Sequence, residues 1–164
     1  DLGVDLGGGT VALELGGLSL TDLALTSGNA PVVLTFSEPN PEPLGLVRIT
    51  AGTGDIVTSG LGNANFDRLS LIGGAGKIHL EFGGAWTRSA VADINAGAGE
   101  ITVRVPAGLG TRVHFSGLAL SNVKTVGFSE QAEGVYVNSA YGQAPLTLTV
   151  NVTTGIGSVI LISE

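Results

Sequence analysis

A glycine pattern recurs along most of this chain and limits the folds that the chain can adopt. Each copy has an apolar residue, two further residues, Gly-x-Gly, one residue and a second apolar residue. Full copies span residues 4–11, 49–56, 71–78, 94–101 and 152–159, and residues 25–32 match with Ala30 in place of the second glycine. The glycines of these copies are Gly7, Gly9, Gly28, Gly52, Gly54, Gly74, Gly76, Gly97, Gly99, Gly155 and Gly157.

The copies recur with a regular period. From Gly7 to Gly97 the first glycine of each copy returns at nearly equal steps along the chain. The step is about 22 residues, which lies in the range of solenoids, in which each repeat packs only against its neighbours. A degenerate copy at Gly117 and a weaker one at Gly142 would continue this period, so strands of successive repeats are expected to lie side by side.

The sequence around each copy predicts strands joined by a corner. Ile78, Leu80 and Phe82 alternate with polar residues, as in a strand with one buried face. The two apolar residues of one copy, such as Ile94 and Ile101, are seven positions apart, so on one continuous strand they would face opposite sides. If both face the core, the chain turns between them, where glycine permits positive φ and close stacking.

These patterns predict an all-β fold in which residues 1–164 form a single β-solenoid domain with coils of about 22 residues and Gly-x-Gly corners. No helical periodicity is sustained anywhere. Residues 37–45, SEPNPEPLG, interrupt the pattern with three prolines that cannot donate ladder hydrogen bonds, and we expect a protruding loop there.

Composition excludes several functions. A net charge of −7 with only seven Lys and Arg argues against nucleic-acid binding and against docking on an anionic membrane. The absence of cysteine excludes disulfides and thiol chemistry. The chain also lacks Met, so we expect an excised fragment or a processed product, with any membrane attachment made through segments missing from it.

The glycine copies superficially resemble nucleotide-binding loops, but the third glycine and the following helix are missing. A calcium column is disfavoured because Lys77 stands between Asp55 and Glu100 at the position after the second glycine. These three residues instead suggest a surface ladder of alternating charge, which stabilises little.

Enzymatic and metal sites are weakly supported. A glycosidase needs two carboxylates in one cleft, and the available acids are Asp55, Asp67, Asp93 and Glu100. His79 and His114 alternate with apolar residues and have no evident third ligand, so surface strand positions are expected. No catalytic residue, cofactor or metal is therefore assigned.

Three residues are candidates for interaction. Trp86 lies between glycines and polar residues, where it either caps a corner of the core or serves as an exposed interface anchor. Glu38 and Glu42 lie in the proline-rich loop and are candidate contacts for a protein partner.

The second half resembles the end of the bacterial toast-rack domains, found in LiaF-like cell-wall stress proteins and in related adhesin-type proteins of unknown function. The matching segments are GLALSNV, GF, VYVNSAYGQA and TGIGSVILI within residues 111–162, and the opening DLGGGTVALELGGLSLTDL resembles the first coil of that family. The resemblance implies a right-handed β-helix-like domain attached to a membrane segment or another domain, without catalytic residues.

The resemblance implies a non-enzymatic structural or protein-interaction module of the bacterial cell envelope, membrane-attached or exported, with envelope-stress signalling as one role. An adhesin-like carbohydrate-binding surface, a carbohydrate-active enzyme and an end-to-end assembling scaffold remain alternatives. The expected partner is a protein of unknown identity, and the expected state is a monomer or weak homo-oligomer.

Overall fold

The computed structural model describes residues 1–117 and 122–164, and this part of the chain is all-β apart from one 3-10 turn, Leu61–Ala64. None of its described helical segments is long and apolar enough to cross a membrane. The strands are β1 (Leu2–Leu6), β2 (Val11–Glu14), β3 (Asp22–Ser27), β4 (Val32–Thr35), β5 (Leu44–Thr53), β6 (Ile56–Ser59), β7 (Phe66–Glu81), β8 (Ala90–Val105), β9 (Gly110–Ser116), β10 (Val123–Val126), β11 (Phe128–Ala132), β12 (Val135–Asn138) and β13 (Thr147–Ser163).

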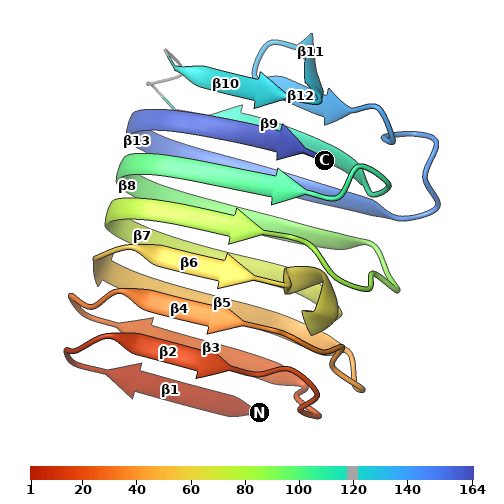
Figure 1. The fold of residues 1–164 in the computed structure, drawn as a ribbon. Coiled ribbons are helices and arrows are strands. Elements are labelled where there is room, and N and C mark those ends of the chain that lie inside the picture. The colour runs from red at the N-terminus through yellow and green to blue at the C-terminus, as the bar shows by residue number, and fades with distance from the viewer. Residues whose placement is uncertain (118–121) are drawn as a thin grey trace.

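The strands stack in two layers joined along one side (Figure 1). One layer, here called face A, has the order β1-β3-β5-β7-β8-β13-β9-β12-β11. The other, face B, has β2, β4, β6, the second halves of β7, β8 and β13, and β10. A coil is one passage through face A, the corner and face B. The long strands β7, β8 and β13 pass through the corner without interruption, and the loops lie at the opposite side.

The coils stack in parallel register with equivalent repeat positions side by side. Val4 pairs with Leu25, and Leu25 pairs with Ile49. The same column continues through Leu71 and Ile94. The apolar residues at the start of the repeat therefore form one continuous ladder inside the molecule, as parallel sheets buried on one face require.

Both apolar residues of a repeat face the core. Ile94 and Ile101 are 0% and 1% exposed, and Leu71 and Ile78 are 0% and 4% exposed. The chain therefore turns between these two residues. On a straight strand, side chains seven positions apart would point to opposite faces of the sheet.

The two glycines of a corner are needed for different reasons. The second has positive φ in every full copy, for example 143° at Gly76 and 137° at Gly99. The first has no such φ, but a Cβ at Gly74 would lie 2.0 Å from the carbonyl oxygen of Gly52 in the preceding coil. The second position is equally crowded, because a Cβ at Gly99 would lie 1.9 Å from the oxygen of Gly76. Only glycine fits this stack.

The order of the last coils differs from the expected succession. β13 lies between β8 and β9, so Gly157 stacks on Gly99 although β9 to β12 separate them in sequence. Gly117 itself lies against Thr154, but residues 118–121 of the degenerate copy predicted there lie outside the described residues. The predicted copy at Gly142 is wrong, because that glycine lies in the turn between β12 and β13. The C-terminal strand β13 is therefore inserted between β8 and β9. The spacing of the glycine copies along the sequence does not show this order.

The proline-rich segment is shorter than predicted, because Leu44 and Gly45 already belong to β5. Asn40 fixes the loop that remains. Its side chain is 4% exposed, and its amide accepts a hydrogen bond from the Leu20 N–H at 3.1 Å and donates one to the Leu20 carbonyl at 2.8 Å. The backbone N–H of Asn40 donates to the Asn63 carbonyl at 2.7 Å. The loop is therefore held against the loops of the neighbouring coils.

Two carboxylates cap loops in the same way. Glu14 Oε1 accepts hydrogen bonds from the backbone N–H of Gly16 at 2.8 Å and of Ser37 at 3.0 Å. Glu81 accepts from Gly83 at 2.7 Å and from Gly60 at 2.6 Å. Each carboxylate thus joins its own coil to an adjacent one. The hydrogen bonds from Ser37 and then Gly16 lower the pKa of Glu14, because they favour the charged form.

The predicted charge ladder is only partly formed. Lys77 and Glu100 are register partners, but Asp55 accepts a hydrogen bond from the backbone N–H of Lys77 at 2.9 Å, and no ion pair joins the three side chains in the described part of the chain. The ion pairs found there are Arg68–Asp93, Arg88–Asp67 and Arg104–Glu164.

The inserted position of β13 can be tested with engineered disulfides, because the chain has no cysteine of its own. Thr102 pairs with Ile160, and Ile160 pairs with Lys124. A Thr102→Cys, Ile160→Cys variant should form a disulfide on mild oxidation, because neighbouring strands are about 4.8 Å apart. A Thr102→Cys, Lys124→Cys variant should stay reduced at roughly 10 Å. Non-reducing mass spectrometry distinguishes the two; a disulfide in the second variant alone would mean that the coils stack in chain order.

The Glu14 cap predicts a pH dependence. A lowered folded-state pKa gives stability that is present above the unfolded value of 4.5 and is lost as the pH falls through the folded value. Glu14→Gln should therefore lower the urea midpoint at pH 7, and this difference from the parent chain should shrink toward pH 3. Glu42→Gln serves as the control, since none of the described hydrogen bonds involves the Glu42 carboxylate. Equal behaviour of both variants across this range would contradict the capping role.

Candidate binding groove

Loops from three coils meet at the side of the stack away from the corners. The loop after β7 contributes Trp86, the turn after β8 contributes Pro106 and Leu109, and the loop before β13 contributes Pro145 and Leu146. Together with Gly84 and Gly108 they line a surface hollow of about 260 Å³. We call this hollow and the charged one beside it the Trp86 groove.

The charged part of the groove has a volume of about 540 Å³. Gly84 and Pro106 line both parts, so the two hollows adjoin. The charged side chains are Glu81, Arg104 and Glu164. Glu81 comes from the end of β7, Arg104 from the end of β8, and Glu164 follows β13. The groove therefore exists because β13 lies next to β8.

Trp86 is half-buried and fixed by its surroundings. The indole N–H donates to the Phe82 carbonyl at 2.7 Å. The ring packs edge-on against Phe66 at a centroid distance of 5.6 Å and lies 6.4 Å from Phe82. Of the two predicted roles, core capping describes this packing, while the exposed part of the ring lines the groove. The structure does not test the role of anchor, which stays a prediction.

The charged side chains are already engaged. The two oxygens of Glu81 accept backbone hydrogen bonds, and Arg104 lies 3.5 Å from a carboxylate oxygen of Glu164. The Nε of Arg104 is buried without a partner among the described residues. Carboxylates held in this way suit hydrogen bonding to hydroxyl groups, whereas glycoside cleavage needs one carboxyl free to protonate a leaving group.

Glu38 and Glu42, the other predicted contacts, are exposed in the loop between β4 and β5. Neither lines the Trp86 groove. Glu38 lies over the turn of the first coil, where its backbone carbonyl accepts from Gly17 at 3.4 Å. The structure therefore does not bring the three predicted residues into one site.

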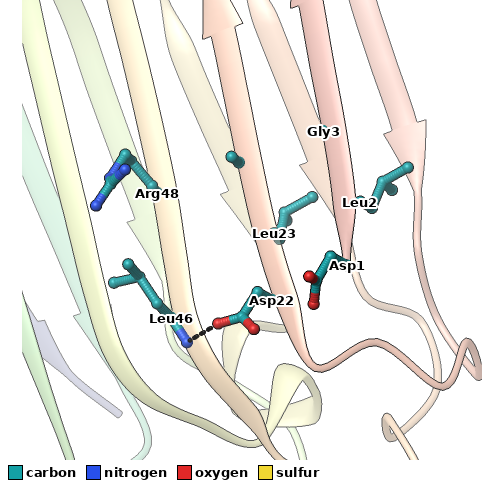
Figure 2. Close-up of a pocket in the computed structure, with 8 residues that line it drawn as sticks. Asp1, Leu2, Gly3, Asp22, Leu23, Leu46 and Arg48 are labelled. Carbon is teal, nitrogen blue, oxygen red and sulfur yellow. Dashed lines mark hydrogen bonds between the residues drawn. The ribbon is translucent and has the colours of Figure 1, made fainter.

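A second hollow, of about 340 Å³, lies on face A near the N-terminal end of the stack (Figure 2). It forms where Gly3 and Ala24 carry little or no side chain, and Leu46 and Arg48 of β5 line it as well. Asp22 closes one side by accepting a hydrogen bond from the Leu46 N–H at 3.2 Å. The charged residues that line it are Asp1, Asp22 and Arg48.

The other candidate residues lie apart from one another. Asp67 pairs with Arg88, while Asp93 pairs with Arg68 at 2.5 Å and accepts from Asn151 at 2.9 Å. His79 and His114 are half-buried strand residues. Within residues 1–117 and 122–164, no three His, Asp or Glu side chains gather as a metal site would require.

Sequence reasoning found Trp86 but missed the rest of the groove. Pro106, Pro145 and Leu146 come from loops outside the glycine pattern, and Glu164 lies beside Arg104 only because β13 is inserted next to β8. The sequence signal that could have pointed there is the lack of a full glycine copy between Gly99 and Gly155, where only the degenerate copy at Gly117 and the weak copy at Gly142 occur.

No protein-family model matches this chain, and no curated protein matches it. A similar solved structure is that of a "putative cell adhesion protein" from Clostridium sporogenes. The two superimpose with a TM-score of 0.69 at 26% sequence identity, covering 76% of this chain and 57% of the other. This chain thus matches little more than half the length of a protein described in terms of cell adhesion.

Proposed function

We propose that this chain is a non-enzymatic, adhesin-type module of a bacterial surface or exported protein, and that the Trp86 groove binds a carbohydrate. The observation that carries the proposal is the groove itself, in which an aromatic ring and two prolines adjoin two carboxylates and a guanidinium. The similarity to a structure described as a cell adhesion protein supports a role in binding rather than in catalysis.

The chemistry of the groove suits a sugar. A pyranose ring has an apolar C–H face that packs on an indole ring, and its hydroxyls both donate and accept hydrogen bonds. Trp86, Pro106 and Pro145 would receive the apolar face, while Glu81 and Arg104 would bind hydroxyls. The indole is already oriented by Phe66 and Phe82, so little conformational entropy is lost on binding.

The scaffold is proposed to be a right-handed β-helix with coils of about 22 residues. Parallel strands connected within one sheet are joined almost always by right-handed crossovers. The coil length is supported by the register from β1 to β8, where each residue pairs with one about 22 residues further along the chain. Such a stack would hold the groove loops rigidly at one side of the molecule.

A protein-interaction role in the cell envelope is the alternative, with Glu38, Glu42 and Trp86 as contacts for a protein partner. The exposure of both glutamates favours it. The comparisons lend no support to envelope-stress signalling, which rests on the sequence resemblance to LiaF-like proteins alone. Attachment to a membrane would use segments outside residues 1–164.

The single tryptophan makes the proposal directly measurable. Binding of a saccharide to the groove should change the fluorescence of Trp86 in a saturable way, using ligands first selected on a glycan array. Arg104→Gln should weaken that binding by about tenfold, because it removes a charged hydrogen-bond donor worth about 1.4 kcal/mol. Trp86→Phe should weaken binding on the array while keeping the packing on Phe66 and Phe82.

The matched control is Arg68→Gln, which removes an arginine from face A, away from the groove. It should bind the selected saccharide like the parent chain. A blank array with protein that shows the cooperative unfolding of the parent chain would contradict the carbohydrate proposal, as would binding that Arg104→Gln and Arg68→Gln reduce equally.

A further inference from the structure

Positive charge gathers on the outer surface of face A. Arg48 of β5, Arg68 of β7 and Arg112 of β9 each lie beside buried residues of the same strand, so their side chains point away from the core. These arginines are three of the seven Lys and Arg residues of the chain. We call the outward side of β5, β7, β8, β13 and β9 on face A the arginine surface.

The arginine surface differs in charge from the rest of the molecule. The acids in its strand segments, Asp67 and Asp93, are both paired with arginine. Arg48 and Arg112 form no ion pair with any described residue. This surface therefore carries a net positive charge, whereas the chain as a whole has a net charge of −7. Such a local reversal of charge favours an anionic ligand.

A hollow of about 360 Å³ lies in the middle of the arginine surface. Its strands, β7, β8 and β13, each pair with a strand on either side, so the hollow lies away from both ends of the sheet. Apart from the buried Ile94, every residue that lines it is polar. These residues are Arg68, Ser70, Asp93, Asn95, Asn151 and Thr153.

Strand pairing arranges these side chains in rows across the sheet. Ser70, Asp93 and Asn151 are register partners, and so are Asn95 and Thr153. Because neighbouring strands are about 4.8 Å apart, each row presents a polar group at that interval. The hollow thus offers a regular series of hydrogen-bonding groups to a ligand that lies across the strands.

The arginines flank this series. Arg68 and Arg112 belong to one row, which runs through Val91 and Thr149. Three strand spacings, about 14 Å, therefore separate the two arginines along the row. A ligand that reaches from one arginine to the other passes over β8 and β13, so an elongated molecule fits this surface better than a small ion does.

The one carboxylate in the hollow is already neutralised. Asp93 accepts a hydrogen bond from Arg68 at 2.5 Å and another from Asn151 at 2.9 Å. The Arg68 side chain is 62% exposed and that of Asp93 only 23%, so the guanidinium is the more accessible partner. Arginine has five N–H donors and an amide has two donors and an acceptor, so Arg68 and Asn151 keep groups for a ligand. Asn95 is exposed, and none of the described hydrogen bonds involves its side chain.

The mixture of groups distinguishes between polyanions. A single-stranded nucleic acid carries a charge on every nucleotide and stacks its bases on aromatic rings. The outward positions of these five described strands hold no Phe, Tyr or Trp. A protein interface has an apolar centre, which the polar lining of the hollow lacks. Amides and hydroxyls between widely spaced arginines instead suit a polymer with many hydroxyls and fewer charges.

We propose that the arginine surface binds an acidic polysaccharide that lies across β7, β8, β13 and β9. Arg68 and Arg112 pair with its carboxylates. Ser70, Asn95 and Asn151 form hydrogen bonds with its hydroxyls. This site is separate from the Trp86 groove and does not depend on the function proposed for that groove.

Fluorescence anisotropy of a fluorescein-labelled oligogalacturonate tests the proposal, with its carboxyl-reduced form as the comparison, since both have the same linkages. The whole chain should bind the acidic oligosaccharide saturably and at least about tenfold more tightly than the neutral one. Added salt should weaken this binding, because exposed charges are screened. Failure to bind the oligogalacturonate, or equal binding of the two forms, would overturn the proposal.

Substitutions locate the site. Arg68→Gln and Arg112→Gln should each weaken binding of the oligogalacturonate by about tenfold, because each removes a charged donor. Asn95→Ala should weaken it by about fivefold. Asp93→Asn should tighten it by about threefold or more, because this change removes a carboxylate and frees the Arg68 guanidinium. Damage to the fold would not produce that gain.

Two controls have the same charge change elsewhere. Lys77→Gln removes an exposed positive charge from the part of β7 on face B, and Arg104→Gln removes one from the Trp86 groove. Both should bind the oligogalacturonate like the parent chain, and all variants should unfold cooperatively as the parent does. Equal losses in Arg68→Gln and Lys77→Gln would overturn the proposal by showing a nonspecific effect of charge.

A loss confined to Arg104→Gln would overturn the proposal too, because it would assign the acidic oligosaccharide to the Trp86 groove. Binding of polyglutamate or of a single-stranded oligodeoxynucleotide as tight as that of the oligogalacturonate would do the same, since the hydroxyls would then have no role. The Trp86 fluorescence used for the groove is independent of these measurements, so either proposal can fail while the other stands.

Discussion

The contact on which the whole structure depends is the one between a corner carbonyl and the glycine of the next coil. At Gly74 and Gly99 a Cβ would lie 2.0 and 1.9 Å from the carbonyl oxygen beneath it, so the spacing of the corners is set by backbone atoms alone. Parallel strands then pair at their normal separation on both faces, and the apolar residues on either side of the corner meet in one core. Stability in such a stack comes mainly from contacts between neighbouring coils.

The position of the candidate groove follows from the same stacking. Because Gly157 rests on Gly99, β13 runs beside β8, and Glu164 comes to lie beside Arg104. β9 to β12, which separate these strands in sequence, lie on the other side of β13 at the end of the stack. The turn at Pro145 and Leu146 lines the groove together with Trp86.

The all-β fold could be predicted from the sequence because its signals are local: alternation, and an odd spacing between Ile94 and Ile101 that requires a turn. The late insertion of β13 could not, since a repeat pattern shows which segments are equivalent but not their order in space. For the same reason Trp86 was recognised as a candidate while Pro145 and Glu164 were missed, because only the insertion of β13 brings them to the groove. The roles of Glu38 and Glu42 stay predictions.

Urea unfolding of Gly74→Ala and Gly7→Ala shows whether the stacked corners hold this fold together. The two glycines hold the same repeat position and neither has a positive φ, but only Gly74 lies against a carbonyl oxygen of a preceding coil. Gly74→Ala should destabilise the chain by about 2 kcal/mol or more, since a close-packed backbone contact must open. Gly7→Ala should change stability by less than about 0.5 kcal/mol. Equal effects of the two substitutions would contradict the stacking of corners as the constraint that defines this fold.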